Sequence, residues 1–377
     1  MDVTAGARDL EAVLDRYRAQ VNDELRAAVA QARTAVSPTS PVRDALAEFQ
    51  GQIEYHFGWR HADLTPARLR SGKLLRPTLL LLACELAAGR NGIEPAEREA
   101  LARRAIPAGV CVELVHNFSL VHDDIEDGDE HRHHRATLWK LWGVPQAINT
   151  GDGIFAMARL ALWRLLEANV PPAVVVRLAE LIDRTCLELC EGQFLDMRFE
   201  GRGDITAAMY LEMIARKTAA LMSCAAEMGA RLAAPDDTDL AAQLARFGRS
   251  LGLAFQLRDD LLGIWAAEAL GKSVAGDLRR KKMSLPIIHA LQAATPTDRE
   301  ALAAIYAEPG PATDAQIATI LGILDRANAR ARVRSALHDE VATARAALDA
   351  AAGDTPEARE PRALLDTLVS FVAAVDE

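Results

Sequence analysis

The sequence predicts an all-α protein built as one large helical bundle. Ala, Leu, Arg and Glu dominate the 377 residues, and apolar residues recur at spacings of three and four. No stretch alternates clearly between apolar and polar residues, as a half-buried strand would. Half of the residues are apolar and a quarter are charged, which is typical of a folded chain with ample core.

Segments that stop helices separate the periodic stretches. They carry Gly, Pro, Asn or Asp, and they fall at 37–43, 89–95, 143–146, 169–172, 201–204, 233–239, 295–298, 307–314 and 352–361. These breaks divide the chain into ten or more helices. Residues 104–122 are apolar on nearly every side, which predicts a central helix wrapped by others. We expect residues 1–36 to form an exposed, charged helix and linker at the edge, and residues 37–377 to form the main domain.

Composition and charge exclude several classes of function. The net charge of −10 argues against a nucleic-acid partner, because binding phosphate backbones needs a basic face. The first twenty residues mix acids and bases and lack the apolar core of a signal peptide. The longest apolar run, 77–89, is interrupted by Glu85 and is too short for a transmembrane segment. The sequence therefore predicts a cytoplasmic protein, whose five cysteines we interpret as buried structural thiols.

An acidic cluster, "DDIED", follows the predicted central helix directly. Asp123 and Asp127 are four residues apart and share a helix face, with Asp124 beside them. At about 6 Å and an effective dielectric near 20, each such pair repels by roughly 3 kcal/mol. Gly128 ends the helix here, and helix C-termini also disfavour anions. A divalent cation would reverse this cost, and Mg²⁺ is commonly held by one or two carboxylates and substrate phosphates. We therefore predict a Mg²⁺ site.

Two other interpretations of this stretch remain open. Most acidic runs are solvated helix ends, although this one adjoins a buried segment where solvation is poor. A zinc site that uses His131, His133 and His134 is also conceivable, but adjacent histidines rarely converge on one ion.

A second acidic pair and several basic residues accompany the first cluster. Asp259 and Asp260 lie inside the apolar helical stretch 254–265. Lys73 and Arg76 are three residues apart, which predicts that they lie on one helical face. Arg offers a fork of donors that suits a phosphate, and Lys offers a point charge. Two carboxylate clusters with several bases suggest a diphosphate held between metal ions and cations.

These motifs together resemble the trans-prenyltransferases, the isoprenyl diphosphate synthases that extend allylic diphosphates with isopentenyl diphosphate. The resemblance covers residues 50 to 300 and implies an all-α isoprenoid synthase fold with a central active-site cavity. It also implies a homodimer and three Mg²⁺ ions per site when substrate is bound. The matching stretches are "GKLLRP" (72–77), "DDIED" (123–127), "GQFLD" (192–196), "KT" (217–218), "FQ" (255–256) and "DDLLG" (259–263).

The resemblance assigns roles to individual residues. It implies Asp123, Asp124, Asp127 and Asp259 as metal residues. It implies Lys73, Arg76, His116 and His133 as contacts of isopentenyl diphosphate. It implies Arg132, Gln193, Lys217, Lys272 and Lys282 as contacts of the allylic diphosphate. Lys217, Thr218, Gln256 and Lys272 would lie near the reacting groups as catalytic residues.

Two positions depart from the family pattern. The last aspartate of the second motif is replaced by Gly263, and the nearest later acids are Glu268 and Asp277. The third metal ion would then be held by Asp259 with help from water. The second arginine of a paired Arg-Arg is His133, for which His134 or Arg135 are possible substitutes.

Product length is predicted from the helix that precedes the first motif. Phe118 and Ser119 lie five and four residues before Asp123, where the family places the wall of the product pocket. A ring beside a small residue resembles medium-chain members, so we expect geranylgeranyl diphosphate (C20). Farnesyl diphosphate (C15) and longer chains are the next alternatives.

Proteins of other classes share some of these motifs. A class I terpene cyclase shares the first acidic motif but does not need "GKLLRP". A non-catalytic subunit of a heteromeric synthase would typically lack the aspartates. A hydrolytic metalloenzyme needs a base or nucleophile beside the metal residues, and the sequence offers none there.

Overall fold

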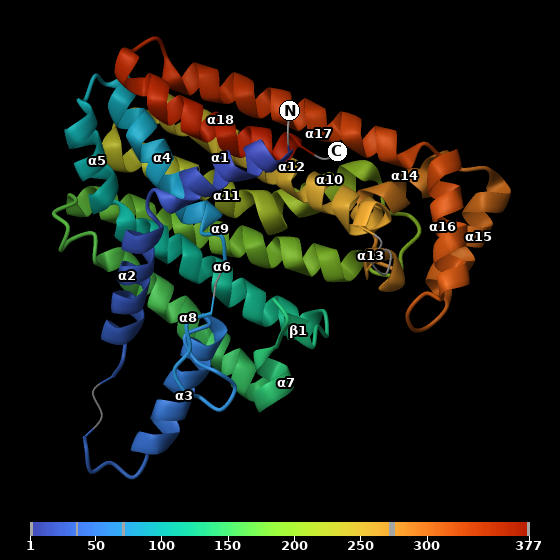
Figure 1. The fold of residues 1–377 in the computed structure, drawn as a ribbon, viewed down its shortest axis with the longest axis horizontal. Coiled ribbons are helices and arrows are strands. Elements are labelled where there is room, and N and C mark those ends of the chain that lie inside the picture. The colour runs from blue at the N-terminus through green and yellow to red at the C-terminus, as the bar shows by residue number, and fades with distance from the viewer. Residues whose placement is uncertain (1–2, 35–36, 70–71, 271–275, 375–377) are drawn as a thin grey trace.

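Helices account for almost all regular structure in the computed structural model, which describes residues 3–34, 37–69, 72–270 and 276–374 (Figure 1). The all-α prediction is confirmed. In chain order the elements are α1 (Val3–Asp15), α2 (Arg18–Gln31), α3 (Arg43–His56), α4 (Leu75–Arg90), α5 (Pro95–Arg104), α6 (Ile106–Glu126), β1 (His131–Arg132), β2 (Arg135–Ala136), α7 (Leu138–Trp142), α8 (Val144–Trp163), α9 (Pro172–Phe199), α10 (Ala207–Ile214), the π-helical turn η1 (Ala215–Ala219), α11 (Ala220–Ala233), α12 (Thr238–Leu270), α13 (Gly276–Arg279), α14 (Leu285–Ala293), α15 (Pro296–Ala307), α16 (Asp314–Arg326), α17 (Ala329–Ala352), the 3₁₀ turn η2 (Pro356–Ala358) and α18 (Arg359–Ala373). β1 and β2 pair as a short antiparallel hairpin and are the only strands within the described ranges.

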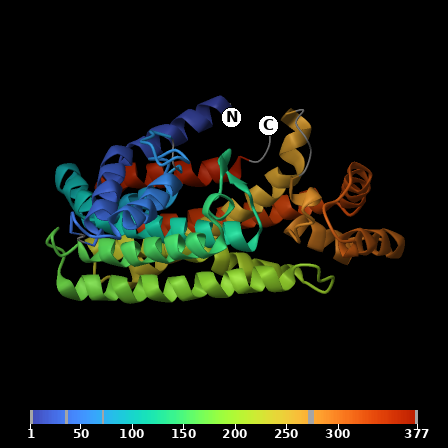
Figure 2. The ribbon, with the colours of Figure 1, turned by 90° about the horizontal axis from the view of Figure 1, so that it is seen from below.

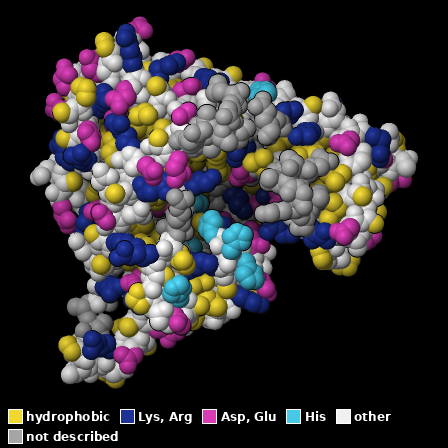
Figure 3. Space-filling model, viewed as in Figure 1, with side chains coloured by type: hydrophobic (Ala, Val, Ile, Leu, Met, Phe, Trp, Pro, Cys, Tyr) yellow, Lys and Arg dark blue, Asp and Glu magenta, His cyan; other side chains and the backbone are white. Residues whose placement is uncertain are grey.

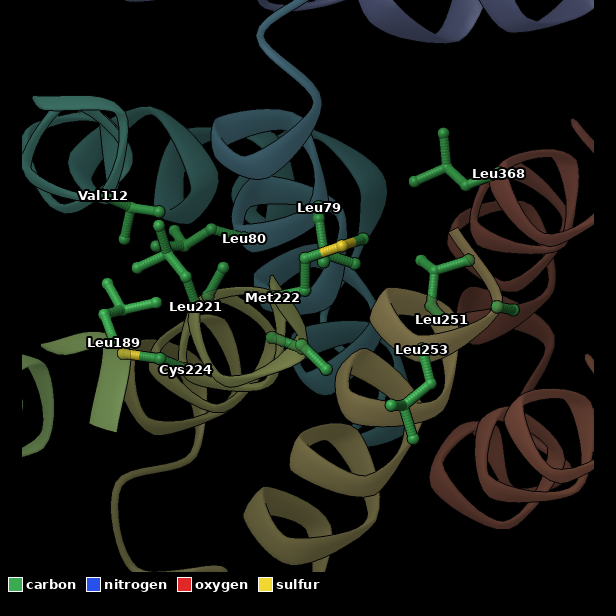
Figure 4. Close-up of a cluster of buried hydrophobic side chains, with 14 of the residues drawn as sticks. Leu79, Leu80, Val112, Leu189, Leu221, Met222, Cys224, Leu251, Leu253 and Leu368 are labelled. Atoms are coloured by element: carbon green, nitrogen blue, oxygen red, sulfur yellow. The ribbon is translucent and has the colours of Figure 1, made fainter. Parts of the chain in front are cut away.

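The centre of the bundle is formed by α4, α6, α11 and α12. Residues 77–89 of α4 are all buried, and α11 packs against both α4 and α12. Figure 4 shows side chains from these helices meeting in one apolar cluster, among them Leu80 of α4, Leu221 of α11 and Leu251 of α12. The charge at Glu85 therefore lies inside the core, where it needs partners.

Outer helices cover this centre on two sides. α17 and α18 pack against α12, α8 packs against α6, and α9 packs against α11 and η1 (Figures 1 and 2). α15 and α16 extend from one end of the bundle (Figure 1). The predicted central helix is α6, which is buried along residues 106–115.

The N-terminal segment differs from the expectation. It forms two helices, and their apolar faces are buried in the common core, with Leu10, Leu14, Tyr17, Val21 and Leu25 each at most 5% exposed. α1 packs against α18 and α4, and α2 packs against α6 and α8. The prediction of an exposed edge helix is therefore wrong, because the apolar residues of this segment pack into the core while most of its described charged residues stay at least partly exposed. The domain boundary at residue 36 stays a prediction.

Four of the five cysteines are buried, as predicted, but Cys190 on α9 is exposed. In the part of the chain that the structure describes, no single helix is long and apolar enough to cross a membrane. Only α5 and α6 taken together, bent by 45° at their junction, reach that length and composition.

Candidate active site

The first acidic motif lies at the C-terminal end of α6. The helix ends at Glu126, Asp127 caps it, and Gly128 follows with a φ of 66°. This confirms the predicted helix end. The hairpin β1–β2 comes next, and its two-residue turn is formed by His133 and His134, both with positive φ, as in a type I′ turn.

A cavity of about 620 Å³ opens beside this helix end. Its lining includes the basic residues Lys73, Arg76, His116, Arg132 and His133, together with Asp124 and Asp259. Figure 3 shows the hollow in the middle of one face, with Lys, Arg and His side chains gathered around it. The bundle thus brings together residues that are far apart in the sequence, such as Lys73 and Asp259. A pocket this rich in cations suits an anionic ligand.

Lys73 reaches this cavity from a loop. α4 begins at Leu75, and Leu74 has a φ of 56°, so the expectation that Lys73 and Arg76 share a helix face is wrong. Arg76 is on the first turn of α4 and its Nε atom has no hydrogen-bond partner. Desolvation lowers the pKa of Arg76, while Glu113 and Asp259 act to raise it. The Arg76 guanidinium therefore has an unused N–H donor with which it can bind an anion in the cavity.

His116 lies on the α6 face that borders the cavity. Desolvation and then the charges of Arg76 and Arg132 hold its pKa well below 6.5. The imidazole is therefore neutral at physiological pH and has one N–H to donate.

The two arginines near the hairpin have different partners. Arg132 Nε donates to Asp124 Oδ1 at 2.7 Å. Burial nevertheless raises the pKa of Asp124 to about 6, although Arg132 acts to lower it. Arg135 donates to the backbone oxygen of Tyr55 at 2.6 Å and lies over the Tyr55 ring. Arg135 thus holds the cavity wall, although it also borders the cavity.

Asp123 and Asp127 face a different set of residues, centred on Lys217. Burial raises the pKa of Asp123 to about 7, and the charge of Lys217 opposes this shift. Lys217 Nζ donates to Asp196 Oδ2 at 2.6 Å. Desolvation lowers the pKa of Lys217, but the carboxylates of Asp196, Asp123 and Asp127 outweigh this and raise it.

The backbone around Lys217 explains how it reaches the acidic motif. Lys217 and Thr218 lie in η1, a π-helical turn between α10 and α11, and such turns widen a helix and redirect its side chains. A Cβ at Gly192 of α9 would lie 2.7 Å from the Lys217 Cα. Only glycine at this position lets α9 and η1 approach so closely.

A chain of hydrogen bonds extends from Thr218 into the core. Thr218 Oγ1 donates to Gln256 Oε1 at 2.9 Å, and Gln256 Nε2 donates to Asp260 Oδ1 at 3.2 Å. Tyr210 donates to Asp260 Oδ2 at 2.6 Å, and Asp260 is buried. Asp260 therefore anchors α12, whereas its neighbour Asp259 borders the cavity. Burial raises the pKa of Asp259 to about 6.

The other predicted residues are placed as follows. Gln193 Nε2 donates to Glu126 Oε2 at 2.6 Å. Ser119 donates to the His116 carbonyl, and Phe118 contacts the Phe155 ring with centroids 5.0 Å apart. Lys272 lies outside the described residues.

The structure adds cavity residues that the sequence motifs did not indicate. Phe371 of α18 lies beneath two cations, the Lys73 ammonium at 5.3 Å and the Arg258 guanidinium at 4.4 Å from the ring centroid. Leu10 and Leu14 of α1 complete the same wall. Both ends of the chain thus border the cavity, and no local pattern in the sequence signals this.

The carboxylates fit a hard divalent cation in their chemistry. Within the described ranges, no group of three His, Cys, Asp or Glu side chains is arranged to hold a metal ion by itself, which also removes the three-histidine zinc site. Mg²⁺, however, needs only one or two carboxylates when phosphate oxygens supply the remaining positions. Asp123, Asp127 and Asp259 offer oxygen ligands whose pKa values are all raised by burial. A bound cation would offset the free-energy cost of keeping these carboxylates ionised.

Comparison with known proteins agrees with this geometry. A family model described as polyprenyl synthetase matches residues 64–324. A geranylgeranyl diphosphate synthase from Mycobacterium tuberculosis is 40% identical over 314 residues, which cover 82% of this chain and 81% of the relative. A (2E,6E)-farnesyl diphosphate synthase from Mycobacterium bovis is 42% identical over 277 residues, 72% of each chain.

A solved structure agrees as well. The polyprenyl synthetase from Streptomyces coelicolor A3(2) matches with a TM-score of 0.79 and 35% identity, over 96% of this chain and 98% of that one. Three observations lead to the same conclusion: the helical bundle, the cation-lined cavity beside two acidic motifs, and the similarity along most of the chain. The chain belongs to the polyprenyl synthetase family of trans-isoprenyl diphosphate synthases and is a prenyltransferase.

Proposed function

We propose that this prenyltransferase condenses isopentenyl diphosphate with allylic diphosphates and releases mainly geranylgeranyl diphosphate (C20). The observation that carries the proposal is the pairing of two anion-binding regions. The cavity is lined by Lys73 and Arg76, whereas Asp123 and Lys217 form a cluster at the same end of α6 and are not part of the cavity lining. A cyclase needs a single diphosphate site, and a non-catalytic subunit needs neither.

The allylic diphosphate would bind at the acidic side. The family uses divalent metal ions, and we infer that Asp123, Asp127 and Asp259 hold three Mg²⁺ ions. When bound, these ions would neutralise the charge that develops on the leaving diphosphate. Lys217 and Lys282, with the N–H groups of Arg132 that Asp124 leaves available, would bind the diphosphate oxygens.

Isopentenyl diphosphate would bind in the cavity. Lys73 and Arg76 supply charge, and His116 and His133 supply neutral N–H donors. Holding both substrates on one helix end provides the proximity that a bimolecular step needs. Thr218 and Gln256 would border the reacting carbons and keep Lys217 oriented. Since none of these residues is a suitable base, we propose that the departing diphosphate accepts the proton.

The proposed chain length rests on Phe118, which contacts Phe155 and His122 and is not among the residues that line the 620 Å³ cavity. We expect Phe118→Ala to lengthen the main product by one or more C5 units, because removing the ring deepens the pocket. Product profiles of the variant and wild type, separated by chromatography, measure this. An unchanged profile would show that Phe118 is not the wall.

The proposed reaction is tested directly with purified protein, Mg²⁺, labelled isopentenyl diphosphate and C5, C10 or C15 allylic diphosphates. A Mg²⁺-dependent ladder that ends at C20 supports the proposal. A ladder that ends at C15 would instead favour farnesyl diphosphate, as in the 42% identical relative. Cyclised hydrocarbon without condensation would indicate a cyclase, and no reaction with any substrate would indicate a non-catalytic subunit.

We also propose a homodimer formed through α8 and α9. Their outer faces expose large apolar side chains, including Leu160, Trp163, Val176, Leu187 and Phe194. Clusters of this kind commonly mark protein interfaces. Light scattering should give twice the chain mass of 40.8 kDa, and Phe194→Glu should shift the mass toward one chain. A monomeric wild type would contradict this proposal.

A further inference from the structure

The second acidic motif has a glycine where the family pattern has a carboxylate. Gly263 lies on α12, four residues after Asp259 and three after Asp260, so the three positions share one side of the helix. A Cβ at Gly263 would lie 2.9 Å from the Asp277 Cγ and closer still to its Oδ2. The Asp277 side chain therefore occupies the space where a side chain at position 263 would begin.

Asp277 comes from a different segment, the short helix α13. Its Oδ1 accepts from Arg280 Nη2 at 3.4 Å, and Arg280 Nη1 donates to Asp129 Oδ1 at 2.8 Å. Asp129 lies two residues after the end of the first acidic motif. Arg280 thus connects the ends of both acidic regions, and Asp277 holds one side of this connection against α12.

Asp277 also orients Lys282. The Lys282 backbone N–H donates to the Asp277 carbonyl at 2.9 Å, which closes the turn after α13. Desolvation lowers the pKa of Lys282, but the carboxylates of Asp260, Asp277 and Asp196 outweigh it and keep the ammonium charged. The backbone turn therefore holds Lys282 close to Asp277, and the Asp277 carboxylate contributes to the electrostatic setting of this lysine.

We propose that Asp277 supplies, from α13, the carboxylate that the second motif lacks at Gly263, and that it positions Lys282 and Arg280 for the allylic diphosphate. A merely solvated aspartate would not need glycine opposite it. Here glycine and carboxylate are complementary, since any side chain at position 263 would displace Asp277. The inference rests on the proposed condensation of two diphosphates, and Asp277 acts as a positioning residue.

The first test removes the carboxylate while keeping its shape. Asp277→Asn should raise the KM for the allylic diphosphate about tenfold, the scale of one charge-assisted hydrogen bond, and leave the KM for isopentenyl diphosphate within about twofold. It should weaken binding of Mg²⁺ with inorganic pyrophosphate by a similar factor in calorimetry. The control is Asp314→Asn, because Asp314 pairs with Arg279 of the same segment at 2.5 Å but does not contact Gly263.

The second test examines the pairing with Gly263. Gly263→Ala should impair the wild type as Asp277→Asn does, yet add little in the Asp277→Ala background, because the displaced group is already gone. Gly263→Asp combined with Asp277→Ala should restore the allylic KM to within about threefold of wild type by returning the carboxylate to α12.

The outcomes separate the two proposals. If wild type does not condense the substrates, the proposed function fails. If wild type is active and Asp277→Asn matches it in both KM values and in pyrophosphate binding, the inference on Asp277 is wrong. Additive effects of Gly263→Ala and Asp277→Ala would equally overturn it. Circular dichroism of each variant confirms that the comparison concerns folded protein.

Discussion

Replacing Asp123 by Asn is expected to lower kcat/KM for condensation by about 10³-fold. The change removes a charge placed where the leaving diphosphate and its metal ions would meet the protein, and loss of one preorganised electrostatic group costs 10²–10³-fold or more. The measurement is steady-state kinetics across Mg²⁺ concentrations. Glu130→Gln is the control, since Glu130 follows the motif, is exposed, and pairs with Lys140 at 2.7 Å.

The same Asp123→Asn change is expected to raise the stability of the folded protein, although it lowers activity. The pKa of Asp123 is raised from 3.8 to about 7 in the folded protein, so the folded state binds the proton more tightly than the unfolded state. The free energy of unfolding therefore falls as pH rises from about 4 to 7, and the loss is complete above pH 7. A shift of this size corresponds to at most about 4 kcal/mol.

Asn imitates the protonated carboxyl and avoids this loss. At pH 8 without divalent ions, Asp123→Asn should melt at a higher temperature than wild type. Mg²⁺ with pyrophosphate should raise the melting temperature of wild type more than that of the variant. An inactive variant that is also less stable at pH 8 would point to a structural role for Asp123 and contradict the metal assignment.

Glu85→Ala is expected to lower the free energy of unfolding by about 3–5 kcal/mol, the cost of removing one partner from a buried ion pair. Glu85 is fully buried in α4. It accepts from Tyr17 at 2.6 Å, from two nitrogens of Arg16 at 3.0 Å each, and from Arg98 Nε at 3.2 Å. Arg98 is only 2% exposed, so its charge would lose compensation inside the core.

The effect should also reach the cavity. Arg16 and Tyr17 join the N-terminal helices to α4, and Leu10 and Leu14 of α1 border the cavity. We therefore expect a raised KM for isopentenyl diphosphate with a smaller change for the allylic substrate. Urea or thermal unfolding measures the stability change. Glu99→Ala, which removes an exposed pair with Arg103, should cost less than about 1 kcal/mol. Equal losses for the two variants would show that burial does not control the contribution of Glu85.

The helices and their order could be predicted from the sequence because the signals are local. Apolar spacing and helix-stopping residues depend on neighbours a few positions apart, and they identified α6 as the central helix and placed "DDIED" at its end. The clustering of carboxylates behind an apolar run likewise predicted their electrostatic cost. A helix was predicted at the N-terminus but its burial was not, because charged residues are interspersed with the buried apolar series from Leu10 to Leu25.

Which role each residue has within the site was decided by the tertiary structure alone. Asp259 and Asp260 are adjacent in sequence, yet one borders the cavity and the other is bound by Tyr210 in the core. Lys73 reaches the cavity from a loop, Phe371 lies beneath it from the far end of the chain, and Asp277 fills the space beside Gly263. Composition, periodicity and motif order determined the fold class and the family. Which carboxylate faces which cation depends on how distant helices pack, since burial and charge act through space between residues that no local pattern connects.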